Sequence, residues 1–233
     1  GGASFINKTT LDGLGSDWVQ AIYASDTTIY VGTDWGLSIS TDSGVSFVNK
    51  MTADGLASDT VQAVYVSGST IYVGTDTGLS ISTDGGANFT NKTMANGLGS
   101  DNIFALFVSG STVYAGTDMG LSISTDGGLN FINKTTGEGL GNRWVSSVYV
   151  SGSTVYAGTR GGLSISTDGG TSFTNITAGL NHTFIFSVFV SNSTIYAGNP
   201  GGLNISTDGG ASFTSKTTAD GLGHKLVRQL FVQ

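Results

Sequence analysis

Residues 79–89, which read LSISTDGGANF, decide the fold of this chain. Leu79 and Ile81 alternate with serines, as expected for a strand with one buried face. The Asp-Gly-Gly run at 84–86 supplies turn residues, because glycine tolerates positive φ and aspartate accepts backbone hydrogen bonds. Phe89 follows the turn, where its ring can anchor a returning strand. The stretch therefore predicts a hairpin between two antiparallel strands.

The same hairpin signal recurs along the whole chain. The aspartates of the S-T-D-x-G motif are spaced by 42, 42, 42 and 40 residues, at Asp42, Asp84, Asp126, Asp168 and Asp208. In the second period, four strand signals fall at residues 61–67, 69–75, 79–83 and 87–93, and no segment shows a helical period. Four short strands in each tandem repeat are typical of a propeller blade, whereas β-solenoid coils are usually shorter with fewer turns. We predict one all-β domain over residues 1–233, a five-bladed β-propeller of four-stranded antiparallel blades.

The two ends of the chain repeat each other. Residues 1–5 (GGASF) match residues 209–213, so the 40–42-residue repeats are followed by a redundant end segment of 25 residues. We expect five blades closed by pairing of the N- and C-terminal segments. The redundant segment then adds to an edge, lies displaced, or exchanges with a neighbouring molecule, which gives a monomer or an end-segment-swapped homo-oligomer. A piece cut from a longer array is the alternative.

The motif S-T-D-G-G-x-x-F resembles the Asp box, or BNR repeat, whose usual form is S-x-D-x-G-x-x-W/F. The whole repeat also resembles bacterial surface and regulator-type propeller repeats. In length and blade number the chain is similar to five-bladed tachylectin-type lectins. The resemblance implies that each box is the turn between the third and fourth strands of a blade. It also implies a structural role for the five motif aspartates.

Asp-box proteins include sialidases, and the resemblance therefore raises the possibility of an enzyme. A sialidase of that type needs an arginine triad, a Tyr/Glu nucleophile pair and an acidic proton donor. This chain has three arginines and a single glutamate, Glu138, while its tyrosines recur at matched strand positions, as core residues do. An ordinary glycosidase needs two carboxylates on either side of one bond, and nearly all of the aspartates here sit at equivalent turn positions. We predict a protein without catalytic residues.

The composition limits the classes of partner and cofactor that we expect. The formal net charge of −7 and the pI of about 4.4 describe an acidic surface, which repels phosphate backbones and argues against nucleic acid. Cysteine is absent and neither histidine has a matching His or Cys partner nearby in the sequence, so we predict no metal site and no cofactor. No run reaches the roughly 18 apolar residues of a membrane span. The Ser/Thr/Asn/Gly-rich surface favours an extracellular or cell-envelope location.

The internal copies of the repeat differ most in two loops, the turn between the second and third strands and the loop before the first strand. Antiparallel connectivity places both loops at the same end of each blade. The candidate binding residues in these loops are Trp18, Asp34, Trp35, Arg143, Trp144, Arg160 and His182. Aromatic rings beside carboxylates suit stacking and hydrogen bonding to a sugar.

We therefore predict a non-catalytic, lectin-like binding module with glycans as the preferred ligands. One alternative is that the duplicated loops drift freely or contact another kind of partner. Another is a scaffold propeller without a small-molecule ligand, either engineered or part of a larger extracellular or sensor protein.

Overall fold

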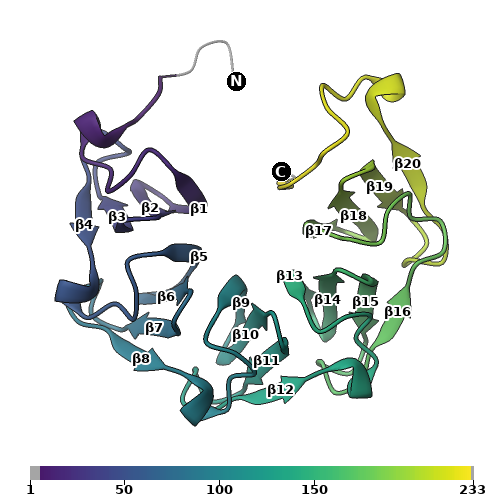
Figure 1. The fold of residues 1–233 in the computed structure, drawn as a ribbon, viewed down its shortest axis with the longest axis horizontal. Helices are drawn as coiled ribbons and strands as arrows, with labels where there is room; N and C mark the ends of the chain where they lie inside the picture. Colours follow the sequence, from purple (N-terminus) through teal and green to yellow (C-terminus); the bar gives the residue numbers. More distant parts are fainter. Residues whose placement is uncertain (1–5, 232–233) are drawn as a thin grey trace. The chain divides into compact units, whose positions relative to one another are not determined.

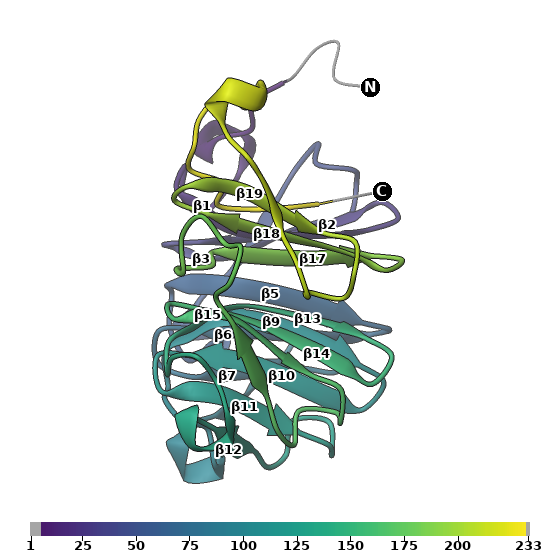
Figure 2. The same cartoon turned by 90° about the vertical axis from the view of Figure 1, so that its right-hand side faces the viewer.

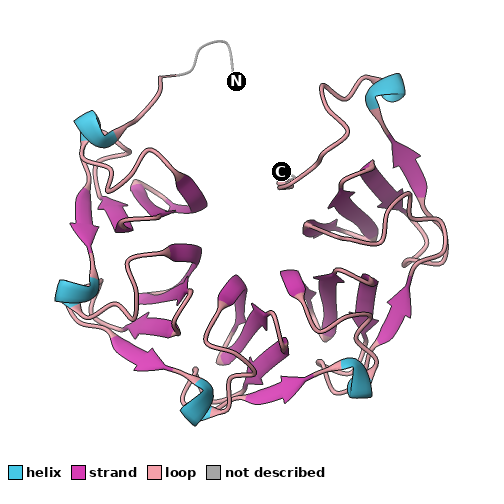
Figure 3. Ribbon diagram, viewed as in Figure 1, coloured by secondary structure: helices cyan, strands magenta, loops and turns pink. Residues whose placement is uncertain are grey.

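The structure is a computed structural model that describes residues 6–231. These residues form twenty strands and five short 3-10 helices, arranged as five four-stranded antiparallel sheets in chain order (Figures 1 and 3). Each sheet is one predicted blade. The chain divides into two compact units: Gly1–Thr93 with Asp101–Ile103, and Met94–Ser100 with Phe104–Gln233. Blades 1 and 2 belong to the first unit. Blade 3, apart from its first residue, belongs to the second unit with blades 4 and 5.

The strands follow one another without crossovers in every blade. Blade 1 contains β1 (Val19–Ser25), β2 (Thr28–Thr33), β3 (Gly36–Ser40) and β4 (Val48–Lys50). Blade 2 contains β5 (Val61–Ser67), β6 (Thr70–Thr75), β7 (Leu79–Ser82) and β8 (Thr90–Lys92). Blade 3 contains β9 (Ile103–Ser109), β10 (Thr112–Thr117), β11 (Gly120–Ser124) and β12 (Ile132–Lys134). Blade 4 contains β13 (Val145–Ser151), β14 (Thr154–Thr159), β15 (Gly162–Ser166) and β16 (Thr174–Ile176). Blade 5 contains β17 (Ser187–Ser191), β18 (Thr194–Asn199), β19 (Gly202–Ser206) and β20 (Thr214–Lys216).

The short helices lie in the loops before the first strands of blades 1 to 4 and after β20. They are η1 (Thr10–Asp12), η2 (Thr52–Asp54), η3 (Met94–Asn96), η4 (Thr136–Glu138) and η5 (Thr218–Asp220). The sequence did not predict them, because three residues are too few to show a helical period. In η4, Glu138 accepts a hydrogen bond from the Thr135 backbone N–H at 2.7 Å, and the Thr135 hydroxyl accepts one from Gly137 at 3.2 Å. The single glutamate of the chain therefore forms a capping box.

The S-T-D-x-G turns are held by their own aspartates. In blade 2, Ser82 Oγ donates to Asp84 Oδ1 at 2.8 Å, and Asp84 accepts further bonds from the backbone and side chain of Asn88 at 2.9 and 2.8 Å. These bonds shorten the fourth strand, which begins at Thr90 instead of the expected residue 87. The bonds from Asn88 lower the pKa of Asp84 to about 2, since they favour its ionised form.

Neighbouring blades pack through a close approach at a repeated glycine. A Cβ on Gly158 of β14 would lie 2.9 Å from Ile185 Cγ2, which precedes the first strand of blade 5. Ile185 is fully buried in a cluster with Leu163 and Val188. In the first unit, Gly32 faces Val61 in the same way, and Val61 is fully buried. The absence of a side chain at this position lets one blade's first strand seat on the preceding blade.

The N- and C-terminal segments that were expected to close the ring belong to different units. Residues 6–8 and 227–231 belong to no strand, and residues 1–5 lie outside the described part of the chain. Residues 227–231 instead lie on blade 5, beside β17 and β18 (Figure 2). Val227 N–H donates to the Asn199 carbonyl at 3.1 Å, and Ile185 makes the matching bond to Thr159 at 2.9 Å. The redundant segment thus occupies the place of a following blade's first strand.

Candidate binding rim

The rim is the end of each blade where the second strand turns into the third and where the first strand begins. In blade 4 the two loops are joined directly, because Arg160 N–H donates to the Trp144 carbonyl at 3.2 Å. The S-T-D-x-G turns lie at the other end, where the Gly169 N–H donates to the Ser153 carbonyl in the turn between β13 and β14 at 3.0 Å. The expected sorting of the loops between two ends is therefore confirmed within this blade.

A buried threonine fixes the turn that presents the rim residues. Thr33 Oγ1 accepts from Trp35 N–H at 3.1 Å and donates to the Gly36 carbonyl at 3.0 Å, while Gly36 has a φ of 100°. The same threonine is buried at 75, 117 and 159. Because this side chain and the glycine hold the turn, the two residues between them are not needed for its geometry. They are the residues that differ from blade to blade.

In the first unit, two tryptophans stand out on the rim of blade 1. Trp18 is 67% exposed and Trp35 is 62% exposed. Val19 pairs with Thr33, so Trp18 and the turn that carries Trp35 flank the same end of the β1–β2 ladder. Beside them, Gln20 Nε2 donates to Asp34 Oδ1 at 2.9 Å. Blade 1 therefore presents two open indole rings together with an amide and a carboxylate.

In the second unit, the rim of blade 4 is built differently. The Trp144 ring stacks on Phe104 with a centroid distance of 4.7 Å and an interplanar angle of 20°. The guanidinium carbon of Arg160 lies 3.5 Å from the centroid of Trp144. A stacked ring and a guanidinium cannot share one face at these distances, so they cover opposite faces of the indole. Arg160 also lies 5.0 Å from the centroid of Phe184.

Further contacts extend this arrangement along the rim. Phe184 lies 4.4 Å from Phe186 between centroids, and the Arg228 guanidinium lies 5.9 Å from the Phe186 ring. On the other side, Arg143 Nη1 donates to the sulfur of Met119 at 3.2 Å. We call this set the arginine–aromatic cluster. It comprises Phe104, Met119, Arg143, Trp144, Arg160, Phe184, Phe186 and Arg228.

The structure brings some of the predicted site residues together and separates others between the units. Trp144 and Arg160 are in contact, and Arg143 adjoins Trp144 in the chain. His182 is exposed, and its Nδ1 accepts from Phe184 N–H at 3.0 Å, so it shapes the loop that carries Phe184. Trp18, Asp34 and Trp35 lie in the first unit.

Sequence reasoning did not select Phe104, Met119, Phe184, Phe186 or Arg228 as site residues. A usable signal was present, since all five stand at positions that vary among the copies. Phe104 and Phe186 occupy a first-strand position that holds glutamine at 20 and 62 and serine at 146. Variation alone does not show which side chains meet, and that step needed the structure.

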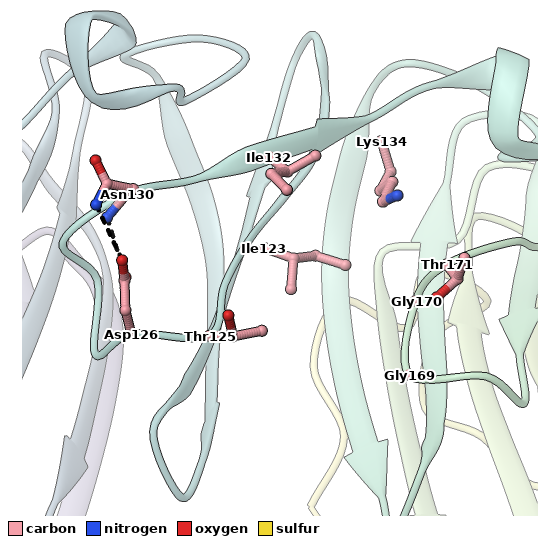
Figure 4. A pocket seen from close by; sticks show the side chains of 9 residues that line it. All are labelled: Ile123, Thr125, Asp126, Asn130, Ile132, Lys134, Gly169, Gly170 and Thr171. Atoms are coloured by element: carbon pink, nitrogen blue, oxygen red, sulfur yellow. Dashed lines mark hydrogen bonds between the residues drawn. The ribbon is translucent and has the colours of Figure 1, made fainter.

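A second recurring feature lies at the opposite end of the blades. In the second unit, a cavity of about 320 Å³ opens between blades 3 and 4 (Figure 4). Ile123 and Ile132 form its apolar side, Lys134 adds an ammonium, and Gly169 and Gly170 of the next turn face them. An equivalent cavity of about 520 Å³ lies between residues 175–178 and 208–211.

The chemistry of these cavities is limited. The Asp126 carboxylate at the edge of the first cavity is engaged within its own turn by Ser124 and Asn130. Within residues 6–231, no three His, Asp or Glu side chains are grouped as a metal ion would require. None of the helices formed by these residues has the length and apolar character to cross a bilayer.

No protein-family model and no curated protein matches the sequence. The fold is similar to that of several solved structures. The extracellular domain of the one-component system BT4673 from B. thetaiotaomicron matches with a TM-score of 0.78 and 19% identity, over 95% of this chain and 31% of that chain. An ancestral GH74 enzyme matches with a TM-score of 0.71 and 21% identity, over 90% and 32% of the two chains. YCF48 bound to D1 peptide matches with a TM-score of 0.65 and 14% identity, over 89% and 69%.

These likenesses are to β-propeller proteins. The chain spans about a third of the length of the sensor domain and the enzyme. The five four-stranded sheets and the propeller neighbours together show an all-β, five-bladed β-propeller fold. The neighbours include extracellular domains of sensor proteins, an enzyme and a peptide-bound protein, so one fold serves several functions.

Proposed function

We propose that this chain is a non-catalytic, carbohydrate-binding module that contacts its ligand through Trp18 and Trp35. The observation that carries the proposal is the pair of indoles, 67% and 62% exposed, at one end of blade 1. Exposure of large aromatic groups to water is unfavourable, and burial against a partner is favourable. Such exposed groups therefore mark interaction sites. A sugar ring offers an apolar face that stacks on such a surface.

Polar groups for the edge of a sugar stand beside these rings. The hydrogen bond between Gln20 and Asp34 orients an amide and a carboxylate before any ligand arrives. A sugar hydroxyl can donate to the carboxylate and accept from the amide, which is the mixed chemistry of small-ligand sites. Trp144 contributes no open face to this function, because Phe104 and Arg160 cover its ring.

The hydrogen bonds of Glu138 and of the motif aspartates support a function without catalysis. Glu138 caps η4, and the five motif aspartates hold their own turns. A glycosidase needs two carboxylates free to act on one bond. The turn geometry also agrees with the Asp-box resemblance, and the extracellular sensor domains among the neighbours support an extracellular setting.

A glycan array followed by calorimetric titration tests the proposal. We expect binding to at least one glycan, and we expect Trp18→Ala and Trp35→Ala to weaken it about tenfold or more, as loss of a stacking aromatic does. Leu129→Ala is the matched control, because Leu129 is 58% exposed in a turn of the second unit. Unchanged affinity in both tryptophan variants, or no binding at millimolar sugar by the folded protein, would refute the proposal.

A scaffold or display role without a small-molecule ligand is the second candidate. The repetition of the buried residues favours it, since the third-strand leucine is fully buried at 37, 79, 121 and 163. Such regularity is what a repeat kept for its shape requires. The absence of any array signal, with a folded protein, would select this candidate.

A further inference from the structure

We propose that the arginine–aromatic cluster of the second unit is a protein-interaction surface that recognises an acidic peptide segment. This inference goes beyond the carbohydrate site, because it uses other residues in the other unit and another class of partner. It rests on three observations: a reversal of charge at one blade, a pre-positioned arginine without a carboxylate partner, and the composition of the surface.

The charge reversal is visible in two rim positions of the repeat. Both positions hold aspartate in blades 1 to 3 and arginine in blade 4. The pairs are Asp17 and Asp34, Asp59 and Asp76, Asp101 and Asp118, and Arg143 and Arg160. Arg228, within residues 227–231 that lie on blade 5, adds a third guanidinium. In a chain with a net charge of −7, these cations make one part of the rim attractive to anions.

Arg160 is positioned before a partner binds. Its backbone N–H is bonded to the Trp144 carbonyl, and its guanidinium carbon lies 3.5 Å from the Trp144 ring centroid and 5.0 Å from the Phe184 ring centroid. Stacking on Trp144 covers one face of the guanidinium and leaves N–H groups at its edge, which match a carboxylate in a bidentate pair. Neither Arg160 nor Arg143 forms an ion pair with any residue between 6 and 231, where the pairs present are Lys8–Asp12 and Lys216–Asp220.

The composition of the cluster points to a protein partner. Aromatic residues, methionine and arginine are enriched at the centres of protein interfaces, and tryptophan and arginine are frequent among residues whose truncation costs most affinity. All of these residue types meet here on one rim. A sugar is disfavoured at this place, because the Trp144 ring has no open face for stacking. An acidic segment that also carries aromatic side chains can contact both the cations and the half-buried rings.

Fluorescence anisotropy with a defined probe tests the proposal. The probe is a fluorescein-labelled octapeptide in which Asp and Tyr alternate, and the matched control peptide has Asn in place of Asp. We expect the acidic peptide to bind and the neutral one to bind at least tenfold more weakly. We also expect affinity to fall as NaCl rises from about 50 to about 500 mM, since salt screens exposed charges.

Variants locate the binding. Arg160→Gln should weaken the acidic peptide at least tenfold, through loss of a charge-assisted bidentate pair. Arg143→Gln should also weaken binding of the acidic peptide. It replaces Arg160→Gln as the test if that variant does not fold, because Arg143 is exposed and its side chain bonds to the Met119 sulfur. Lys50→Gln is the control, since it removes a cation from the fourth strand of blade 1, in the first unit. Circular dichroism and thermal melting establish that each variant is folded.

Three outcomes would overturn the proposal. The first is no binding of the acidic peptide at a protein concentration of about 1 mM, where even weak specific binding is detected. The second is equal affinity of the Arg160→Gln, Arg143→Gln and unmodified proteins for the peptide. The third is tighter, arginine-dependent binding of an oligogalacturonate of matched charge. The last outcome would assign the surface to an acidic glycan. Trp18→Ala should leave peptide binding unchanged, so failure of this proposal and failure of the carbohydrate proposal can be told apart.

Discussion

The guanidinium carbon of Arg160 lies 3.5 Å from the centroid of the Trp144 ring, and the two residues come from the two loops that meet at the rim of blade 4. The contact joins the turn between β14 and β15 to the residue before β13. It therefore acts within the fold as well as on the surface, and its strength can be measured by unfolding.

Arg160→Lys should lower the free energy of unfolding by about 0.5–1 kcal/mol, because an ammonium stacks less well than a planar guanidinium on an indole at an exposed site. Urea denaturation followed by circular dichroism measures this change. Arg143→Lys keeps the same charge at a residue whose described contact is to the Met119 sulfur and not to a ring, so it should change stability less. Equal effects of the two substitutions would contradict a specific role for the contact with Trp144.

Acid should destabilise the fold in a defined window. The pKa of Asp84 and of Asp208 is lowered to about 2 from the ordinary value of 3.8, by hydrogen bonds from Asn88 and Ser212 respectively. Their contribution to stability is complete above the unfolded-state pKa near 4 and is lost as pH falls toward 2. Thermal melting between pH 7 and pH 2 should show Tm falling below about pH 4.

An asparagine variant separates these turns from the other acids. Asp84→Asn should lower Tm at pH 7 and flatten its fall with acid, because the amide cannot lose a negative charge. Asp76→Asn replaces an exposed aspartate in a rim turn of the same blade and is the control. If the Asp76 variant flattened the curve equally, the motif aspartates would not be the source of the acid sensitivity.

The close approach at Gly158 predicts a cost for any side chain there. A Cβ would lie 2.9 Å from Ile185 Cγ2 and 3.2 Å from Val188 Cγ2, both on blade 5. Gly158→Ala should reduce the unfolding free energy by about 1–3 kcal/mol, as overpacking of a core does. Denaturation in urea gives the value, and Gly137→Ala is the matched control, since its nearest neighbour would be Thr135 Oγ1 at 3.4 Å. A neutral Gly158 variant would show that the blades can move apart without loss.

Two substitutions of Glu138 separate the contribution of its capping hydrogen bond to stability from the contribution of its negative charge. Glu138→Ala removes the acceptor for the Thr135 N–H and should cost about 0.5–2 kcal/mol, the range measured for lost helix caps. Glu138→Gln keeps an oxygen at the same place and should cost clearly less. Thermal unfolding distinguishes the two. An equal loss in both variants would mean that the negative charge, and not the hydrogen bond, is the contribution.

Much of the blade was predictable because its signals are local. Period-two alternation and the Asp-Gly-Gly run determine hairpins on their own, and β5 occupies the residues 61–67 expected for it. The fourth strand is shorter than expected, because Asn88 bonds to Asp84 instead of joining the ladder. The short helices escaped prediction since their caps, not a period, determine them.

The rim was predictable only as a region. Variation among internal copies selected Trp144 and Arg160, but Phe104 and Phe184 come from the neighbouring blades and no pattern in one repeat indicates that they meet. The seat of residues 227–231 on blade 5 also depends on contacts across repeats. Such contacts are set by how blades pack, and a motif read within one repeat carries no information on that packing.

Residues 227–231 cover blade 5 as the opening strand of another repeat would, with Val227 against Gly198 as Ile185 is against Gly158. The boundary of the sequence repeat therefore differs by one strand from the boundary of the packed unit, which is a blade together with the strand that covers it. The first strand of each repeat covers the hydrophobic surface of the preceding blade. An array of this kind can therefore gain or lose whole repeats while the hydrophobic surface of every blade stays covered. Gene duplication alone, without compensating substitutions, is then enough to change the number of blades.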